Sequence, residues 1–100
     1  MFTQATRYSA TEQAMEKGEK IYKEKAKPMW SKQQGFHSMN MYKVAEGPNK
    51  GHRLVVLRFN DLASMDAARE KLGEQREAML KELDQAGIKT EEVMKLEEIG

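Results

Sequence analysis

Few residues of this chain have the chemistry of a catalytic group, and its two histidines, His37 and His52, are the first to consider. Imidazole titrates near neutral pH, so His37 is the candidate general base. The histidines fall at opposite ends of two predicted strands, about 23 Å apart at a rise of about 3.3 Å per residue, and cannot share a metal ion. The chain has no cysteine, which excludes disulfides and thiolate ligands. We therefore expect no metal site and no cofactor.

A second group of residues points to ligand binding. Asn40, Tyr42 and Arg58 fall on one face of the same two predicted strands, where they could orient a polar group, and Arg58 would anchor an anion. Trp30 and His37 would lie near the rim, and the eight methionines suit a compliant apolar cavity. The alternative is that these Met and Tyr residues form core or dimer contacts. No G-x-S-x-G or glycine-rich phosphate motif is present.

Charge and motif content argue against a nucleic-acid partner. Lys plus Arg total 17 and Asp plus Glu total 16, for a net charge of +1, whereas a phosphate-binding surface needs concentrated basic charge. The segment beginning at Lys50-Gly51 resembles the third-strand motif of RNA-recognition domains. However, His52, Leu54 and Leu57 occupy the positions that need stacking aromatic rings. We expect no nucleic-acid binding.

The sequence also gives no sign of a membrane or export signal. The longest aliphatic run, residues 54–57, is far shorter than the roughly 20 residues of a membrane span. The first residues form neither a basic nor an apolar targeting region. We expect a cytoplasmic protein without a membrane partner.

Hydrophobic periodicity predicts six elements in the order strand, helix, strand, strand, helix, strand. The predicted strands cover residues 2–8, 36–44, 52–60 and 90–98. The two helices occupy the long amphipathic segments between them, the second of which is capped by Asn60 or Asp61. This is the ferredoxin-like β-α-β-β-α-β order of an α+β protein, with residues 1–100 as a single domain.

Local signals refine the helices. An S-x-x-E capping box begins at Ser9, and Pro28 should make the last turn of the first helix irregular. Gly73 should break the second helix into two pieces. Gly35 and Gly87 are predicted to be the left-handed residues that end the two helices.

Pairing residue 44 with residue 52 across the hairpin assigns the side chains to two faces. The face covered by the helices would carry Met39, Met41, Val55, Leu57 and Phe59, with His37 at its end. The open face would carry Ser38, Asn40, Tyr42, Leu54, Val56 and Arg58. A strand that is apolar on both faces normally has both covered, so we expect a second copy of the chain to cover the open face.

The chain resembles the dimeric α+β barrel superfamily, which includes the antibiotic-biosynthesis-monooxygenase-like and stress-responsive barrel proteins. The resemblance lies in the element order, in Gly35-Phe36 before the second strand, and in the capped helix at Asn60-Asp61-Leu62. It implies two sheets packed face to face, with a cleft between sheet and helices in each subunit. The Asn, Trp and His trio of the haem-degrading members does not carry over, because residues 61–87 contain neither His nor Trp.

Two functions stay open. The first is a homodimeric barrel that binds a small hydrophobic or aromatic molecule or acts in a stress response. The alternative is a cofactor-independent monooxygenase or isomerase of an aromatic or polyketide-like substrate, for which the protein supplies only a base and an oriented pocket. A cavity containing His37 or Arg58 would favour the enzyme, and a sheet face filled by a partner's side chains would favour the binding protein.

Dimerisation through the open face gives the first testable prediction. Burial of one aliphatic side chain is worth about 1.5–3 kcal/mol, so Val56→Asp should yield monomeric or unfolded protein, because it puts an unpaired carboxylate in a closed interface. Lys20→Asp, on the solvated side of the first helix, is the control and should change little. Sedimentation equilibrium at micromolar concentration measures the outcome. A wild-type monomer that tolerates Val56→Asp would contradict the dimer.

Overall fold

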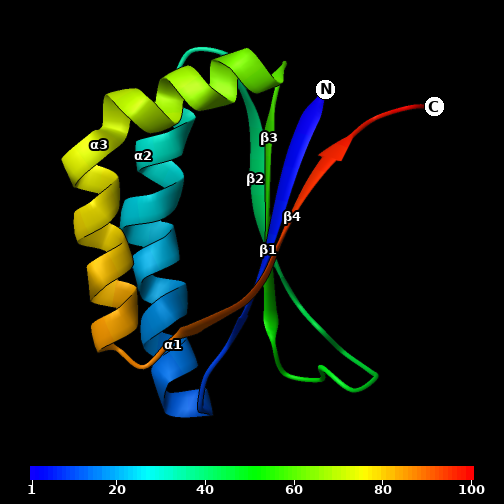
Figure 1. Cartoon of the computed structure of the whole chain (residues 1–100). Helices are drawn as coiled ribbons and strands as arrows, with labels where there is room; N and C mark the ends of the chain where they lie inside the picture. Colours follow the sequence, from blue (N-terminus) through cyan, green and yellow to red (C-terminus); the bar gives the residue numbers. More distant parts are fainter.

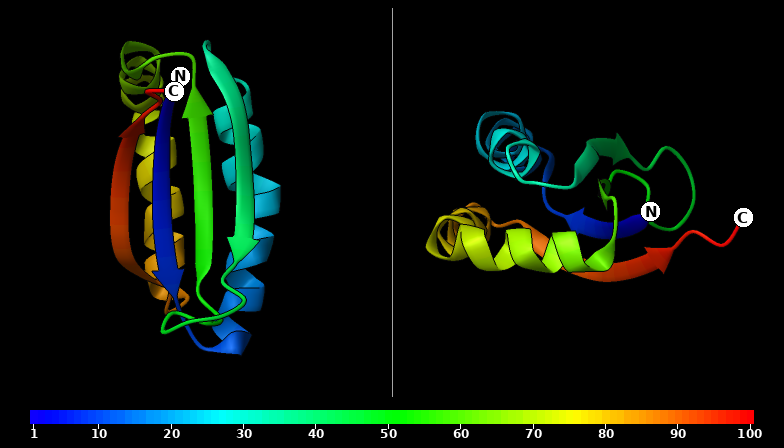
Figure 2. Two further views of the ribbon diagram at one scale, coloured as in Figure 1. Left: turned by 90° about the vertical axis from the view of Figure 1, so that its right-hand side faces the viewer. Right: turned by 90° about the horizontal axis from the view of Figure 1, so that it is seen from above.

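A four-stranded antiparallel sheet with its helices on one face makes up the protein, in a computed structural model that describes all 100 residues (Figure 1). The strands are β1 (Phe2–Ser9), β2 (Phe36–Lys43), β3 (Arg53–Phe59) and β4 (Lys89–Glu97), in the spatial order β2-β3-β1-β4. The first helical segment comprises α1 (Glu12–Ile21), the π-helical turn η1 (Tyr22–Ala26) and α2 (Lys27–Ser31), and the second is α3 (Leu62–Gln85). The predicted ferredoxin-like layout is confirmed. Figure 2 shows the opposite face of the sheet without a helix over it.

The pairing of β2 with β3 confirms the predicted faces, with one exception at His37. Tyr42 pairs with Leu54 and Ser38 pairs with Arg58, as the predicted register requires. Between Phe36 and Ser38 the register shifts, and the extra residue of this irregularity is His37. His37 is exposed, with its Nδ1 3.2 Å from the Ser38 hydroxyl. The prediction that His37 lies at the end of the covered face is therefore wrong.

The first helix begins two residues later than a cap at Ser9 requires. Thr11 is the N-cap, and its hydroxyl accepts a hydrogen bond from the backbone N–H of Ala14 at 3.2 Å. Ser9 is the last residue of β1, and its hydroxyl donates to the Glu91 carboxylate at 2.6 Å. The predicted capping box is wrong because β1 remains paired with β4 through Ser9.

Pro28 distorts the helix on its N-terminal side. Proline has no N–H to donate to the carbonyl one turn earlier, and the chain widens into the π-turn η1 just before it. There the N–H of Lys27 donates to the carbonyl of Tyr22, five residues back. The helix is irregular near Pro28, but the prediction of an irregular last turn is wrong, because the π-turn precedes Pro28 and α2 continues as a regular helix to Ser31.

Five glycines have a positive φ, and three of them, Gly35, Gly73 and Gly87, have different structural roles. Gly87 ends α3 as predicted, because its N–H donates to Asp84 and that of Ile88 donates to Leu83 in a Schellman arrangement. Gly73, at φ 39° and ψ −112°, divides α3 into two pieces, and the bend is visible in Figure 1. Gly35 does not end a helix, since α2 has already ended at Ser31.

Gly35 instead permits a close approach between the start of β2 and the start of α3. Its φ is +85°, and a Cβ added there would lie 2.6 Å from Cβ of Ser64. The Gly35 carbonyl also accepts a hydrogen bond from the N–H of Asn60 at 2.8 Å. This contact holds the first turn of α3 over the aromatic centre of the core, where Trp30 and Phe36 both meet the fully buried Phe59 edge-to-face at 5.9 and 6.0 Å.

Substitution of Gly35 measures this contact. Gly35→Ala combines an unfavourable positive φ with a steric clash, so we expect a loss of about 2–4 kcal/mol in the free energy of unfolding. Gly47 also has a positive φ, 98°, but nothing lies within 4 Å of an added Cβ. Gly47→Ala should therefore lose only about 1–2 kcal/mol. Urea denaturation of both variants separates the two causes, and equal losses would show that the approach to Ser64 is not tight.

Candidate functional site

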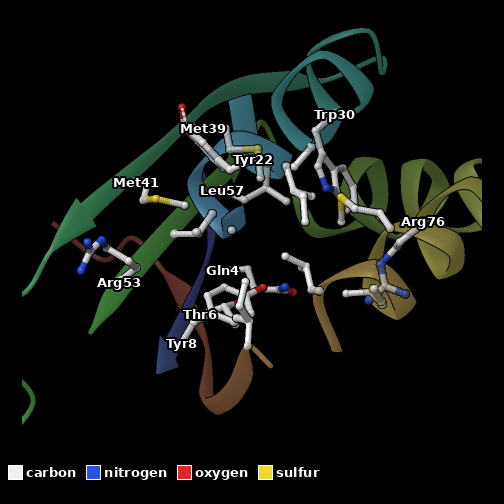
Figure 3. A pocket seen from close by; sticks show the side chains of 18 of the residues that line it. Gln4, Thr6, Tyr8, Tyr22, Trp30, Met39, Met41, Arg53, Leu57 and Arg76 are labelled. Carbon is white, nitrogen blue, oxygen red and sulfur yellow. Dashed lines mark hydrogen bonds between the residues drawn. The ribbon is translucent and has the colours of Figure 1, made fainter. Parts of the chain in front are cut away.

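The helices do not fill the covered face of the sheet, and a cavity of about 90 Å³ lies between the two layers. Fourteen of its 19 lining residues are hydrophobic, which is the usual composition of a small-molecule site. Besides Tyr8, the hydrophobic lining residues are Met15, Ile21, Tyr22, Ala26, Trp30, Met39, Met41, Val55, Leu57, Met79, Leu80, Leu83 and Ile88, and Gly18 adds a stretch of backbone. Gln4, Thr6, Tyr8, Arg53 and Arg76 supply the remaining polar groups (Figure 3).

One side of the cavity is a row of polar side chains from β1. Gln4, Thr6 and Tyr8 alternate along the strand, so all three face the helices. The side-chain Oε1 of Gln4 accepts a hydrogen bond from Nη2 of Arg69 at 2.7 Å. Burial raises the pKa of the Tyr8 phenol, while Thr6 and the charge of Arg76 act in the opposite direction. Tyr8 is therefore a protonated hydrogen-bond donor at neutral pH.

Tyr22 and Trp30 form the aromatic part of the opposite wall. The buried Tyr22 hydroxyl donates to the carbonyl oxygen of Met39 at 3.1 Å, which ties η1 to β2. Burial, followed by the charge of Tyr42, raises the pKa of Tyr22. Trp30 is the only tryptophan of the chain and is 5% exposed, so its fluorescence can report on the contents of the cavity.

Arg53 is a buried cation whose charge is already compensated. Its side chain is 7% exposed, its Nε donates to the Glu19 carboxylate at 2.9 Å, and its Nη2 lies 3.9 Å from Glu12. Its Nη1 also donates to the carbonyl oxygen of Gly51. Arg53 thus links β3 to α1 and leaves little positive charge for a ligand.

Arg76 is the second cation of the cavity, and it has no such partner. It lies half-buried on α3 and takes part in none of the ion pairs or side-chain hydrogen bonds of the structure. Burial lowers the pKa of its guanidinium and the charge of Arg69 acts in the same direction, while Tyr8 and Glu77 act in the opposite direction. Figure 3 shows Arg53 and Arg76 at opposite ends of the cavity.

The structure does not place all of the predicted site residues in one pocket. Asn40, Tyr42 and Arg58 lie exposed on the open face, as their register predicted, but Trp30, expected near the rim of the same pocket, lines the cavity on the other side of the sheet. Arg58 is not directed inward, and the bulge leaves His37 outside the cavity. These four residues do not form a pocket with Trp30, because successive side chains of a strand point to opposite faces.

Sequence reasoning missed Tyr8, Arg53 and Arg76. Arg76 carried a usable signal, because it follows Leu72 by four residues and precedes Met79 by three, within the apolar face of the helix. Tyr8 gave no such signal. It shares its face of β1 with the polar residues Gln4 and Thr6, and a buried strand face is normally recognised by its apolar residues.

The cavity offers orientation and charge, but no conventional base. None of its lining residues is His, Asp or Glu. No three His, Cys, Asp or Glu side chains lie together in an arrangement that could hold a metal ion. Neither helical segment combines the length and apolar character needed to cross a membrane.

Comparisons with solved structures show the fold. No protein-family model and no curated protein sequence matches this chain. A Deinococcus radiodurans protein with a provisional assignment as an antibiotic biosynthesis monooxygenase superposes with a TM-score of 0.80 at 12% identity, over 100% of this chain and 94% of its own. SnoaB, a cofactor-independent oxygenase from Streptomyces nogalater, gives 0.76 at 14% identity, over 97% and 91%. HapK from Hahella chejuensis gives 0.74 at 13% identity, over 100% and 94%. The chain has the α+β fold of the antibiotic-biosynthesis-monooxygenase-like proteins, as the sequence predicted.

The Arg53–Glu19 pair at one end of the cavity can be tested by substitution. Glu19→Gln leaves a buried guanidinium without its closest carboxylate, so we expect a loss of about 1–3 kcal/mol in the free energy of unfolding. Glu16→Gln, an exposed position on the same helix, should lose less than about 0.5 kcal/mol. Urea denaturation compares them. Equal stability of the two variants would mean that Glu19 does not compensate Arg53.

Proposed function

We propose that this protein is a homodimer that binds a small hydrophobic or aromatic molecule in the cavity of each subunit. The observation that carries the proposal is the cavity itself, which has an apolar lining, a tryptophan in one wall and a few convergent polar groups in the other. Such a combination is the usual form of a ligand site. A hydrophobic core without a ligand function would be packed to a density that leaves little space.

The homodimer accounts for the open face of the sheet. One row across this face contains Asn40, Val56, Ala5 and Met94, and the next contains Ser38, Arg58, Thr3 and Leu96. Met94 is 37% exposed and Leu96 is 46% exposed. Exposed apolar residues in adjacent rows mark an interaction surface, and a second copy would cover them.

A second candidate function is cofactor-independent oxygenation of the bound molecule. It is favoured by the structural similarity to SnoaB, a cofactor-independent oxygenase. In such a reaction the substrate itself supplies the electrons to oxygen. The absence of His, Asp and Glu from the cavity lining favours simple binding, because no residue there is a ready base near neutral pH.

Filling the cavity tests ligand binding. 4-Nitrotoluene, a neutral aromatic quencher, should quench Trp30 fluorescence saturably in the wild type. Ala26→Leu places a larger side chain in the cavity lining and should abolish the saturable component while the fold persists. Ala67→Leu, an exposed position on α3, is the matched control and should bind as the wild type does.

Two outcomes decide between the functions. Quenching that does not saturate, or that Ala26→Leu leaves unchanged, would contradict a binding cavity. Oxygen uptake with 1-naphthol that depends on the protein and disappears in Ala26→Leu would establish turnover. Saturable binding without oxygen uptake supports the binding protein.

A further inference from the structure

The two arginines of the cavity differ in their counter-charges. Arg53 contacts Glu19 and the carbonyl oxygen of Gly51, so its end of the cavity is electrically compensated. Arg76 takes part in none of the ion pairs of the structure, and Glu77, the carboxylate whose charge acts on it, is exposed and outside the cavity lining. The Arg76 end of the cavity is therefore positive.

An uncompensated guanidinium next to an apolar cavity is a costly arrangement. Removal of a charge from water without a counter-ion is unfavourable, and the lowered pKa of Arg76 reflects this burial. Its neighbours in the cavity wall, Met79 and Leu80, offer no acceptor. An anionic ligand would replace the hydration that the guanidinium of Arg76 has lost. The low polarity of the surroundings would strengthen the attraction between the anion and Arg76.

Tyr8 adds a hydrogen-bond donor to the same site. Tyr8 comes from β1 and lines the same cavity as Arg76. Burial keeps the Tyr8 phenol protonated and therefore uncharged. Tyr8 can donate a hydrogen bond to an anionic oxygen of the ligand, and it does not itself form an ion pair with Arg76. Two donors of this kind suit one ionised oxygen.

We propose that Arg76 and Tyr8 make this cavity selective for an organic anion that has an apolar, aromatic body and one ionised oxygen. The inference rests on the proposed ligand-binding function and names its chemical class. Phenolates, enolates and aromatic carboxylates share this chemistry. The apolar body lies against Trp30 and Leu57, and the oxygen accepts hydrogen bonds from Arg76 and Tyr8.

A matched pair of ligands tests the proposal on the intact protein. 4-Nitrophenol and 4-nitrotoluene differ by a hydroxyl in place of a methyl group, both quench tryptophan, and nitrophenolate has its own absorption band. We expect the phenol to bind more tightly as pH rises and its ionised form accumulates. Its pKa in the complex should be lower than in solution by about 1–2 units. Binding of 4-nitrotoluene should not depend on pH in this range.

Variants at position 76 assign the effect. Arg76→Met should lose about tenfold to a hundredfold in affinity for the phenolate, the usual loss for a charge-assisted hydrogen bond, and keep its affinity for 4-nitrotoluene. Arg76→Lys should restore part of the phenolate affinity. Lys81→Met removes the same charge from an exposed position on α3 and should bind both ligands as the wild type does.

The outcomes distinguish this inference from the function on which it rests. If both ligands bind but the pKa of nitrophenol is unchanged or raised, or if Arg76→Met binds phenolate normally, the anion selectivity is wrong and the cavity remains a binding site. If neither ligand quenches Trp30 saturably, the proposed function is wrong as well. Circular dichroism of each variant confirms that the fold is intact.

Discussion

Two helical segments can cover only one face of a four-stranded sheet, and this limit determines where the apolar residues of the chain lie. On the covered face, Val55, Leu57 and Phe59 of β3 are buried within the subunit. On the other face, Leu54 and Val56 of the same strand are only half-buried. A chain of 100 residues buries a modest share of its surface by itself. The alternation along β3 therefore gives the molecule two apolar regions, one internal and one at the surface.

The internal region is itself divided. At one end, the fully buried Phe59 packs edge-to-face with the neighbouring rings of Trp30 and Phe36. Towards the other end, Ala26 of η1 and the polar row of β1 leave the layers incompletely filled. The same covered face thus contains a rigid aromatic cluster and a cavity next to it. Trp30 belongs to both, so a ligand would contact a side chain that the core already holds in place.

The sequence predicted the layout well and the site poorly, for physical reasons. Element order, hairpin register, the Gly73 break and the Gly87 cap follow from periodicity and local backbone chemistry, which are readable within a few residues. The position of Ser9 depended on pairing with β4, some 80 residues away, and no local signal reports that. Asn40, Tyr42 and Arg58 do lie on the face that the helices leave open, as their register predicted, but the cavity with Trp30 is on the opposite face, and strand register does not reveal such a space between layers.

His37 illustrates the same limit on a smaller scale. A single extra residue in β2 moves its imidazole from the covered face into solvent, and no propensity distinguishes this bulge from a regular strand. Arg76 needed tertiary information of another kind. Helical periodicity indicates that Arg76 is half-buried. Its lack of a carboxylate partner depends on residues of other elements, such as β1 and η1, that line the same cavity.

The break at Gly73 separates two roles within α3. Residues before it, including Met65 and Ala68, are fully buried parts of the core, whereas Arg76, Met79 and Leu80 after it form a wall of the cavity. Because the helix is interrupted, a change of side chain in the wall is not transmitted along a continuous helix into the core. Mutations could therefore alter ligand preference without loss of the fold. Four of the 19 residues that line the cavity, Arg76, Met79, Leu80 and Leu83, belong to this half of α3, so substitutions there would reshape the cavity without altering the buried residues at the start of the helix.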